Sequence, residues 1–169
     1  MSTDRLGEPL HKYPAVTVSV CNLRPESRGT VHVGGPDLSV APEIRPNYLS
    51  TVGDRLLATK SVRHARRLME AGAIRKYRPQ EMLPGLEYQS DEELIRRVGD
   101  IATTIFHPVG TCKMGNDVMA VVDPQLRVHG LAKLRVVDAS IMPTIVSGNT
   151  NSPVIMIAEK AAESVLSGA

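Results

Sequence analysis

The sequence predicts an α+β fold, in which an antiparallel sheet with helices is followed by a C-terminal strand and helix. Three features of its 169 residues support this prediction. Alternating apolar and polar residues occur early in the chain, helical hydrophobic spacing occurs in its middle, and a short apolar run precedes a long helical pattern near its end. The length is sufficient for one domain with a hydrophobic core.

Two early segments have the period-2 pattern of half-buried strands. Residues 15–23 read AVTVSVCNL, and residues 28–35 read RGTVHVGG after a loop that contains proline. Because such neighbouring strands usually pair directly, we expect these two to form an antiparallel pair. The following stretch contains Pro42 and Pro46, and we expect it to be irregular.

Two helices are predicted in the middle of the chain. The first covers residues 50–71, where Val52, Leu56, Leu57, Leu68 and Met69 share one face, and Gly72 is expected to stop it. The second begins with Ser90 followed three residues later by Glu93, the pattern of a capping box. Its apolar positions are Leu94, Ile95 and Val98.

The last third of the chain differs in pattern. Residues 134–140 form a short apolar run that contains Asp138, as in a strand buried on both faces. A helix is then predicted with Pro153 at its first position. Its wide apolar stripe indicates deep packing and consists of Val154, Ile157, Ala158, Ala161 and Val165.

Composition excludes several classes of protein. The net charge of +2 is too small to indicate a nucleic-acid-binding protein, and the basic cluster at residues 63–67 is expected to be a solvated helix face. Cys21 and Cys112 have no metal-ligand spacing, so we expect no metal site and a reducing compartment. No signal peptide and no apolar run of roughly 20 residues is present, so we expect a cytoplasmic chain without a membrane span.

Two polar turns attract attention because they lie outside the periodic patterns. Residues 106–115 read FHPVGTCKMG and contain His107, whereas residues 147–153 read SGNTNSP and precede the last helix. The N-terminus of a helix carries unpaired N–H groups and a partial positive charge, so it suits an anion or a polarised carbonyl. These residues alone leave two interpretations open, a functional site or ordinary structural roles.

The structural interpretation has a specific form for each residue. Asn149 or Asn151 would be the N-cap of the last helix, and His107 a hydrogen-bonded loop residue. A phosphate-binding loop is excluded, because Asn116 and Asp117 stand where its Lys and Ser or Thr would be.

Taken together, several motifs resemble those of the glucose–methanol–choline (GMC) oxidoreductases. SRGTVHVGG, NYLS, SDEEL, HPVGTCKMG and the stretch from VVDPQLRVHG to MIAEKAA occur in the order found in the C-terminal third of that family. The chain looks most similar to choline dehydrogenases and related alcohol dehydrogenases. The resemblance runs from about residue 13 to the end and is most specific between residues 107 and 162.

The resemblance implies an FAD-dependent oxidation of an alcohol by hydride transfer to the flavin N5 atom. His107 matches the histidine that takes the hydroxyl proton, and Asn149 matches the second polar residue, which hydrogen-bonds the substrate oxygen. Asp138 and Ala139 match positions near the pyrophosphate and ribityl chain. The resemblance also places the start of the last helix at the cofactor. Asn151, Ser152 and Pro153 would lie at the flavin C2 carbonyl, and the preceding Asn149 and Thr150 are also expected to bind the cofactor.

One family motif is absent. The 13 glycines form no GxGxxG pattern, which in the family begins the dinucleotide-binding domain. We therefore expect a fragment with a substrate-binding region at residues 1–106 and an active-site region at residues 107–169. In the full-length family the final strand and helix complete an FAD-binding α/β domain. Retention of FAD by this chain alone is expected to be weak.

Two hypotheses from different classes follow. The chain is either the active-site part of an FAD-dependent alcohol oxidoreductase or a non-catalytic remnant that folds or self-associates without FAD. The first implies a small alcohol substrate and an N-terminal FAD-binding half as partner. The second implies homo-oligomers formed through exposed apolar surface.

Overall fold

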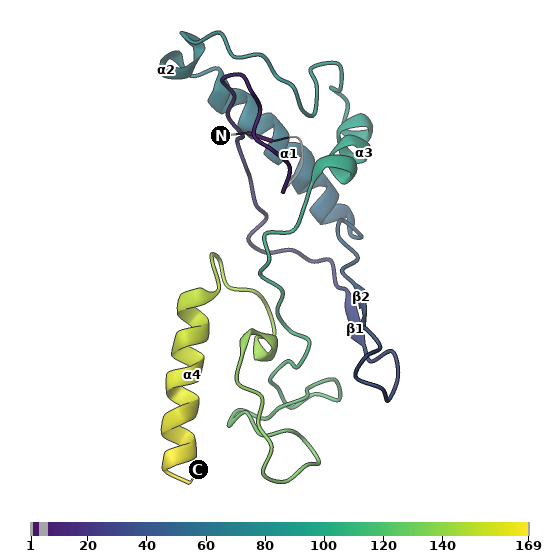
Figure 1. Cartoon of the computed structure of the whole chain (residues 1–169), viewed down its shortest axis with the longest axis vertical. Helices are drawn as coiled ribbons and strands as arrows, with labels where there is room; N and C mark the ends of the chain where they lie inside the picture. The colour runs from purple at the N-terminus through teal and green to yellow at the C-terminus, as the bar shows by residue number, and fades with distance from the viewer. Residues whose placement is uncertain (1, 4–6, 169) are drawn as a thin grey trace. The chain divides into compact units, whose positions relative to one another are not determined.

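The computed structural model describes residues 2–3 and 7–168. The chain forms two compact units, each assembled from two stretches of sequence. The first unit combines Met1–Arg28 with Tyr48–Thr103, and the second combines Gly29–Asn47 with Thr104–Ala169. Helices and a two-stranded antiparallel sheet are both present, so the predicted α+β class is confirmed (Figure 1).

Helices α1 (Val52–Met69) and α3 (Asp91–Ile101) pack together in the first unit, and both were predicted. The predicted capping box is confirmed, because the Ser90 hydroxyl accepts from the N–H of Glu93 while Glu93 accepts from the N–H of Ser90. Gly72 does not end α1; it opens the short helix α2 (Gly72–Arg75). Figure 1 shows α3 beside α1.

Few residues make up the core of the first unit. Leu94 is fully buried, and Val98 lies one helical turn later on the same face of α3. Thr59 of α1 is 1% exposed, and its hydroxyl donates to the backbone carbonyl of Leu56 at 2.9 Å. This bond satisfies a polar group that would otherwise be costly to bury.

The segment before α1 is held by a buried carboxylate and does not form a strand. Asp54, 6% exposed, accepts from the Asn22 amide at 2.9 Å and from the backbone N–H groups of Glu26 and Ser27 at 3.1 and 2.7 Å. The predicted strand at residues 15–23 is therefore wrong. Asn22 and the polar residues after it turn the chain toward Asp54, and residues 15–23 pair with no strand in the described ranges.

The sheet is a hairpin of β1 (Thr30–His32) and β2 (Glu43–Arg45), with Val31 opposite Ile44. The prediction of a strand within residues 28–35 is confirmed, but its partner is a stretch expected to be irregular. Gly29 is required at the base, because a Cβ there would collide with the backbone carbonyl of Arg45. The two prolines in that stretch flank β2, where they remove no hydrogen bond from its ladder.

The second unit packs around a small apolar core and contains little regular secondary structure. The buried residues Val122, Leu126, Ile141 and Ala161 form a cluster with partly buried Met114, Val121, Val128, Val136 and Ile157 around it. The predicted strand at residues 134–140 is wrong, because it contains a single bridge, Arg127 to Arg135, and ends in the 3-10 turn Ala139–Ile141. Its apolar residues pack against the core without forming a ladder.

Helix α4 (Asn151–Leu166) is confirmed, although it begins two residues before Pro153. Ala161 is buried and Ile157 packs on the same cluster, and Figure 1 shows the 3-10 turn beside this helix. The prediction of deep packing is wrong within this chain, since Ala158 and Val165 of the predicted stripe are exposed.

Candidate functional site

His107 follows an unusual backbone conformation. Phe106 has a φ of 61°, a left-handed value that is uncommon outside glycine, and its N–H donates to the Thr104 hydroxyl at 3.0 Å. Pro108 comes directly after the histidine and restricts its backbone to extended conformations. The half-buried His107 is thus constrained from both sides. Such outliers cluster at functional sites.

Backbone hydrogen bonds join the loop after His107 to the 3-10 turn at residues 139–141. The N–H of Cys112 donates to the Ser140 carbonyl at 3.0 Å, and that of Met114 to the Ile141 carbonyl at 2.7 Å. Gly110 has a φ of 87°, and a Cβ there would lie 3.3 Å from the Met142 carbonyl oxygen. Only glycine adopts this positive φ without strain and leaves room for the Met142 carbonyl.

The second polar turn leads into α4. Asn149 is exposed, and Thr150 is the N-cap residue but makes no side-chain cap hydrogen bond. The first helical residues, Asn151 and Ser152, are exposed. Backbone N–H groups at a helix start that no side chain caps are available to a ligand and carry the positive end of the helix dipole.

A direct hydrogen bond joins the two polar turns. The Nδ1 atom of His107 lies 2.8 Å from the Oγ1 atom of Thr150, although the residues are 43 positions apart. Thr150 directly precedes α4 and follows Asn149, so the structure brings the predicted base and the predicted second polar residue into one part of the second unit. Nε2 of His107 has no hydrogen-bond partner among residues 2–3 and 7–168.

Asp138 has a structural role at the start of the 3-10 turn Ala139–Ile141. Its carboxylate accepts from the N–H of Ser140 at 2.7 Å and so caps the 3-10 turn that begins at Ala139. Ser140 Oγ is buried and has no hydrogen-bond partner within the described part of the chain. A buried hydroxyl without a partner is costly. The expected cofactor contacts of Asp138 and Ala139 remain a prediction.

Thr150 was expected at the cofactor, but its contact with His107 was not foreseen. No local pattern signals a bond between residues so far apart, and one threonine in a turn is unremarkable in composition. The structure, by contrast, makes Thr150 one of the few polar residues that are buried, 7% exposed.

Residues 2–3 and 7–168 contain neither a metal-ligand cluster nor a helix that could span a membrane. Among them no three His, Cys, Asp or Glu side chains gather where a metal ion would bind, and Cys21 and Cys112 are free thiols. None of the helices in the described ranges has both the length and the apolar character needed to cross a bilayer.

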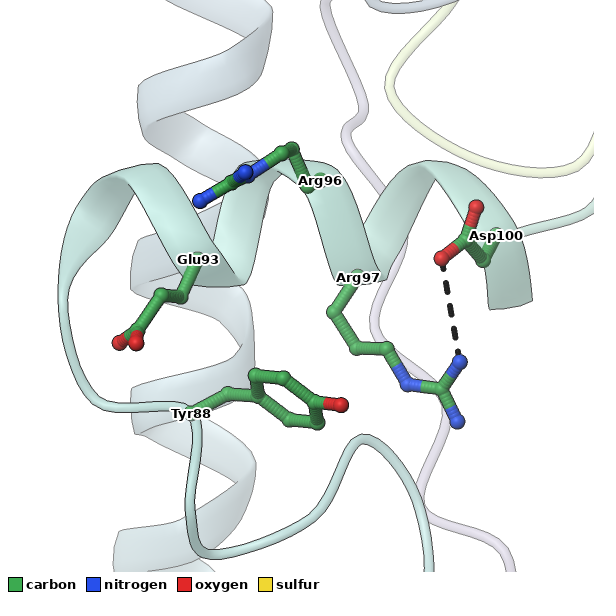
Figure 2. Close-up of a pocket in the computed structure, with 5 residues that line it drawn as sticks. All are labelled: Tyr88, Glu93, Arg96, Arg97 and Asp100. Atoms are coloured by element: carbon green, nitrogen blue, oxygen red, sulfur yellow. Dashed lines mark ion pairs between the residues drawn. The ribbon is translucent and has the colours of Figure 1, made fainter.

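The first unit contains a separate open pocket on α3 (Figure 2). The guanidinium carbon of Arg97 lies 5.7 Å from the centre of the Tyr88 ring. Nη1 of Arg97 lies 3.8 Å from Oδ2 of Asp100. Its Nε also donates to the Pro84 carbonyl at 3.2 Å. These contacts tie the preceding loop to the helix, and no predicted site residue lines this pocket.

Several known proteins are similar to this chain in sequence and in fold. The family model described as GMC oxidoreductase matches residues 25–158. The chain is 45% identical over 150 residues to the alcohol dehydrogenase [acceptor] of Pseudomonas putida, covering 89% of this chain and 27% of that protein. It is 49% identical over 146 residues to the oxygen-dependent choline dehydrogenase of Citrobacter koseri, covering 86% of this chain and 26% of that protein.

A solved structure agrees with this similarity. The FAD-dependent oxidoreductase from Chaetomium thermophilum superposes with a TM-score of 0.80 at 29% identity, over 85% of this chain and 25% of that one. The chain thus spans about a quarter of the length of the relatives that it matches.

Proposed function

The chain belongs to the GMC oxidoreductase family, and from that premise we propose that it forms the His107-containing part of an FAD-dependent enzyme that oxidises an alcohol. The observation that carries the proposal is the hydrogen bond from His107 to the residue before α4. It joins the family's two polar motifs, which are far apart in the sequence. Relatives named as choline dehydrogenase and alcohol dehydrogenase support an alcohol as the substrate.

The residues at the start of α4 are suited to hold the flavin. FAD, when bound, would supply the acceptor for the hydride that leaves the alcohol carbon. The first-turn N–H groups of Asn151 and Ser152 are not capped by the Thr150 side chain, and they offer donors and positive potential to a carbonyl oxygen. Ser140 offers an unpaired hydroxyl near Asp138 and Ala139. The residues present therefore fit this group.

The proton chemistry is assigned to His107. A neutral imidazole with Nδ1 engaged by Thr150 can accept the hydroxyl proton of the alcohol at Nε2. The exposed amide of Asn149 is proposed to donate to the same substrate oxygen as its negative charge develops. The O–H bond of the alcohol breaks, and its proton stays on the imidazole until it is passed to solvent.

The wider assignments are also proposals. We place the enzyme in the cytoplasm, where Cys21 and Cys112 stay reduced. We propose that the exposed apolar side chains of α4 are covered by an FAD-binding partner region and not by a second copy.

Purified alone, the 169-residue chain should retain FAD well below one per chain, because the sequence has no GxGxxG turn for the pyrophosphate. Flavin absorption of the purified chain measures this.

The direct test is turnover in an FAD-containing enzyme that includes this chain. His107→Ala should lower alcohol turnover by roughly 100-fold or more, the scale of a lost general base. His129→Ala is the matched control, since His129 is an exposed histidine of the same unit that bonds the Gly115 carbonyl. Equal turnover of the two variants would remove His107 from the reaction.

A further inference from the structure

The Thr150 side chain hydrogen-bonds His107 and does not cap the helix that follows it. A threonine at the N-cap of a helix normally accepts from a backbone N–H of the first turn. Here the Thr150 side chain makes no such bond, and its Oγ1 lies 2.8 Å from Nδ1 of His107. With only 7% of the residue exposed, water does not compete strongly for that hydroxyl.

The hydrogen bond fixes which ring nitrogen faces the reaction. Nδ1 is directed at Thr150, whereas Nε2 has no partner among residues 2–3 and 7–168. A neutral imidazole that is to accept a proton at Nε2 must carry its single proton on Nδ1. That N–H needs an acceptor on the buried side of the ring, and a hydroxyl oxygen supplies one.

We propose that Thr150 is the positioning residue for His107: its Oγ1 accepts from Nδ1–H and thereby presents an unprotonated Nε2 to the substrate. This inference rests on the proposed function, in which His107 is the base. The histidine and its orienting group correspond to the base and third member of other nucleophile–base–orienter arrangements, but with a neutral hydroxyl as the orienter.

The same bond serves both protonation states of the ring. Once Nε2 has taken up a proton, Nδ1–H still donates to Oγ1, and the bond becomes charge-assisted. The ring therefore does not have to turn during the reaction. Serine at position 150 keeps the hydroxyl, whereas valine has nearly the shape of threonine and no hydroxyl. The two substitutions separate the hydrogen bond from the packing.

The first test uses the 169-residue chain labelled with ¹⁵N in its histidine rings, at about pH 8, where an ordinary histidine is neutral. The His107 signals are identified by their loss in His107→Ala. We expect the wild type and Thr150→Ser to carry the proton on Nδ1, and Thr150→Val to shift it to Nε2. Thr144→Val, a change at an exposed threonine of the same unit, should leave these signals unchanged.

Several outcomes would overturn the inference. A wild-type ring protonated on Nε2 refutes it without any variant, so the test survives a Thr150→Val chain that fails to fold. An unchanged tautomer in Thr150→Val, or an equal shift in Thr144→Val, refutes it as well.

The second test measures kinetics in an FAD-containing enzyme that includes this chain. Thr150→Val should lower kcat by roughly 10-fold or more with little change in KM, because a misoriented base affects the transition state and not ground-state binding. Thr150→Ser should restore most of the rate. If His107→Ala abolishes turnover while Thr150→Val matches the wild type, this inference fails and the proposed function stands. If His107→Ala has no effect, the proposed function itself fails.

Discussion

The two compact units of the chain are stabilised in different ways. The first unit contains regular helices, and polar side chains of α1 hold its loops. The buried Asp54 binds residues 22–27, and the half-buried Arg66 binds Glu81 of the loop before α3 at 2.9 Å. The second unit has one long helix, and its irregular loops are held by an apolar cluster and by backbone hydrogen bonds. The candidate site lies in the second.

This difference shows what an irregular unit is able to provide. A regular helix or strand fixes its side chains in repeating directions, whereas a loop can turn two distant segments toward one point. His107 depends on such a loop, with a left-handed residue before it and a proline after it. The position of His107 therefore depends on the apolar cluster beneath this loop, which belongs to the second unit. We expect substitutions in the first unit to change its stability, and substitutions in the second unit to change the site.

The largest expected effect lies in the second unit and concerns the reaction alone. Asn149→Ala should raise the barrier to alcohol oxidation by about 3 kcal/mol, as when one donor to a developing oxyanion is removed. Since Asn149 is exposed, the free energy of unfolding should not change. Turnover and urea unfolding of the same variant measure both quantities.

Asn151→Ala is the matched control for that substitution. It should weaken flavin binding more than it slows turnover at saturating cofactor, because Asn151 lies at the start of α4. Equal kinetic effects of the two substitutions would contradict separate roles for the two asparagines.

In the first unit the largest effect should come from its apolar core. Leu94→Ala should lower the free energy of unfolding by about 3 kcal/mol, because the side chain is fully buried between α3 and its neighbours. Leu86→Ala, at a residue that is 61% exposed, is the control. Urea denaturation gives both values, and similar midpoints would show that Leu94 is not a core residue of this unit in solution.

The core of the second unit should be slightly less sensitive. Val122 is fully buried in the apolar cluster, and Val122→Ala removes two methyl groups at a cost of about 2 kcal/mol. Because this cluster lies beneath the site loops, the same variant should also disturb the ¹⁵N signals of His107. Val118→Ala, at a residue that is 98% exposed, should change neither quantity. An undisturbed His107 in a destabilised Val122→Ala chain would show that the loop does not depend on the cluster.

The smallest effect concerns acid stability of the first unit. Burial raises the pKa of Asp54, but hydrogen bonds from the Ser27 hydroxyl and from the N–H groups of Glu26 and Ser27 outweigh it, so the net pKa is lowered. The stabilisation is therefore fully present above the unfolded-state value of about 3.9 and is lost as pH falls through the folded-state value.

Asp54→Asn tests this sign. At neutral pH the substitution should cost about 1.5 kcal/mol through weakened hydrogen bonds to a charged group, and the difference from the wild type should shrink as the pH falls below about 4. Glu8→Gln, at an exposed glutamate of the same unit, should leave the urea midpoint unchanged. A difference that grows toward acid pH would contradict the lowered pKa of Asp54.

The sequence predicted the helices well because their signals are local. The capping box at Ser90 and Glu93 and the apolar face of α1 are each contained within a few turns of helix. The strands were predicted less well because pairing depends on distant residues. Residues 15–23 alternate as a strand does, yet Asn22 and the residues after it bind Asp54, and β1 pairs with β2.

The candidate site could be predicted only through the resemblance to the GMC family. His107 and Asn149 have no local pattern that separates a catalytic residue from a structural one. The hydrogen bond between His107 and Thr150 spans 43 positions and depends on the packing of the whole second unit, so no spacing rule reveals it.

The dependence of turnover on pH tests most directly whether His107 is the base. It should be measured for the wild type and His107→Ala in an FAD-containing enzyme that includes this chain. If His107 is the base, wild-type turnover should fall toward acid pH, because a protonated imidazole cannot accept the alcohol proton, and the residual activity of His107→Ala should lack this fall. The same fall in both proteins would contradict this role of His107.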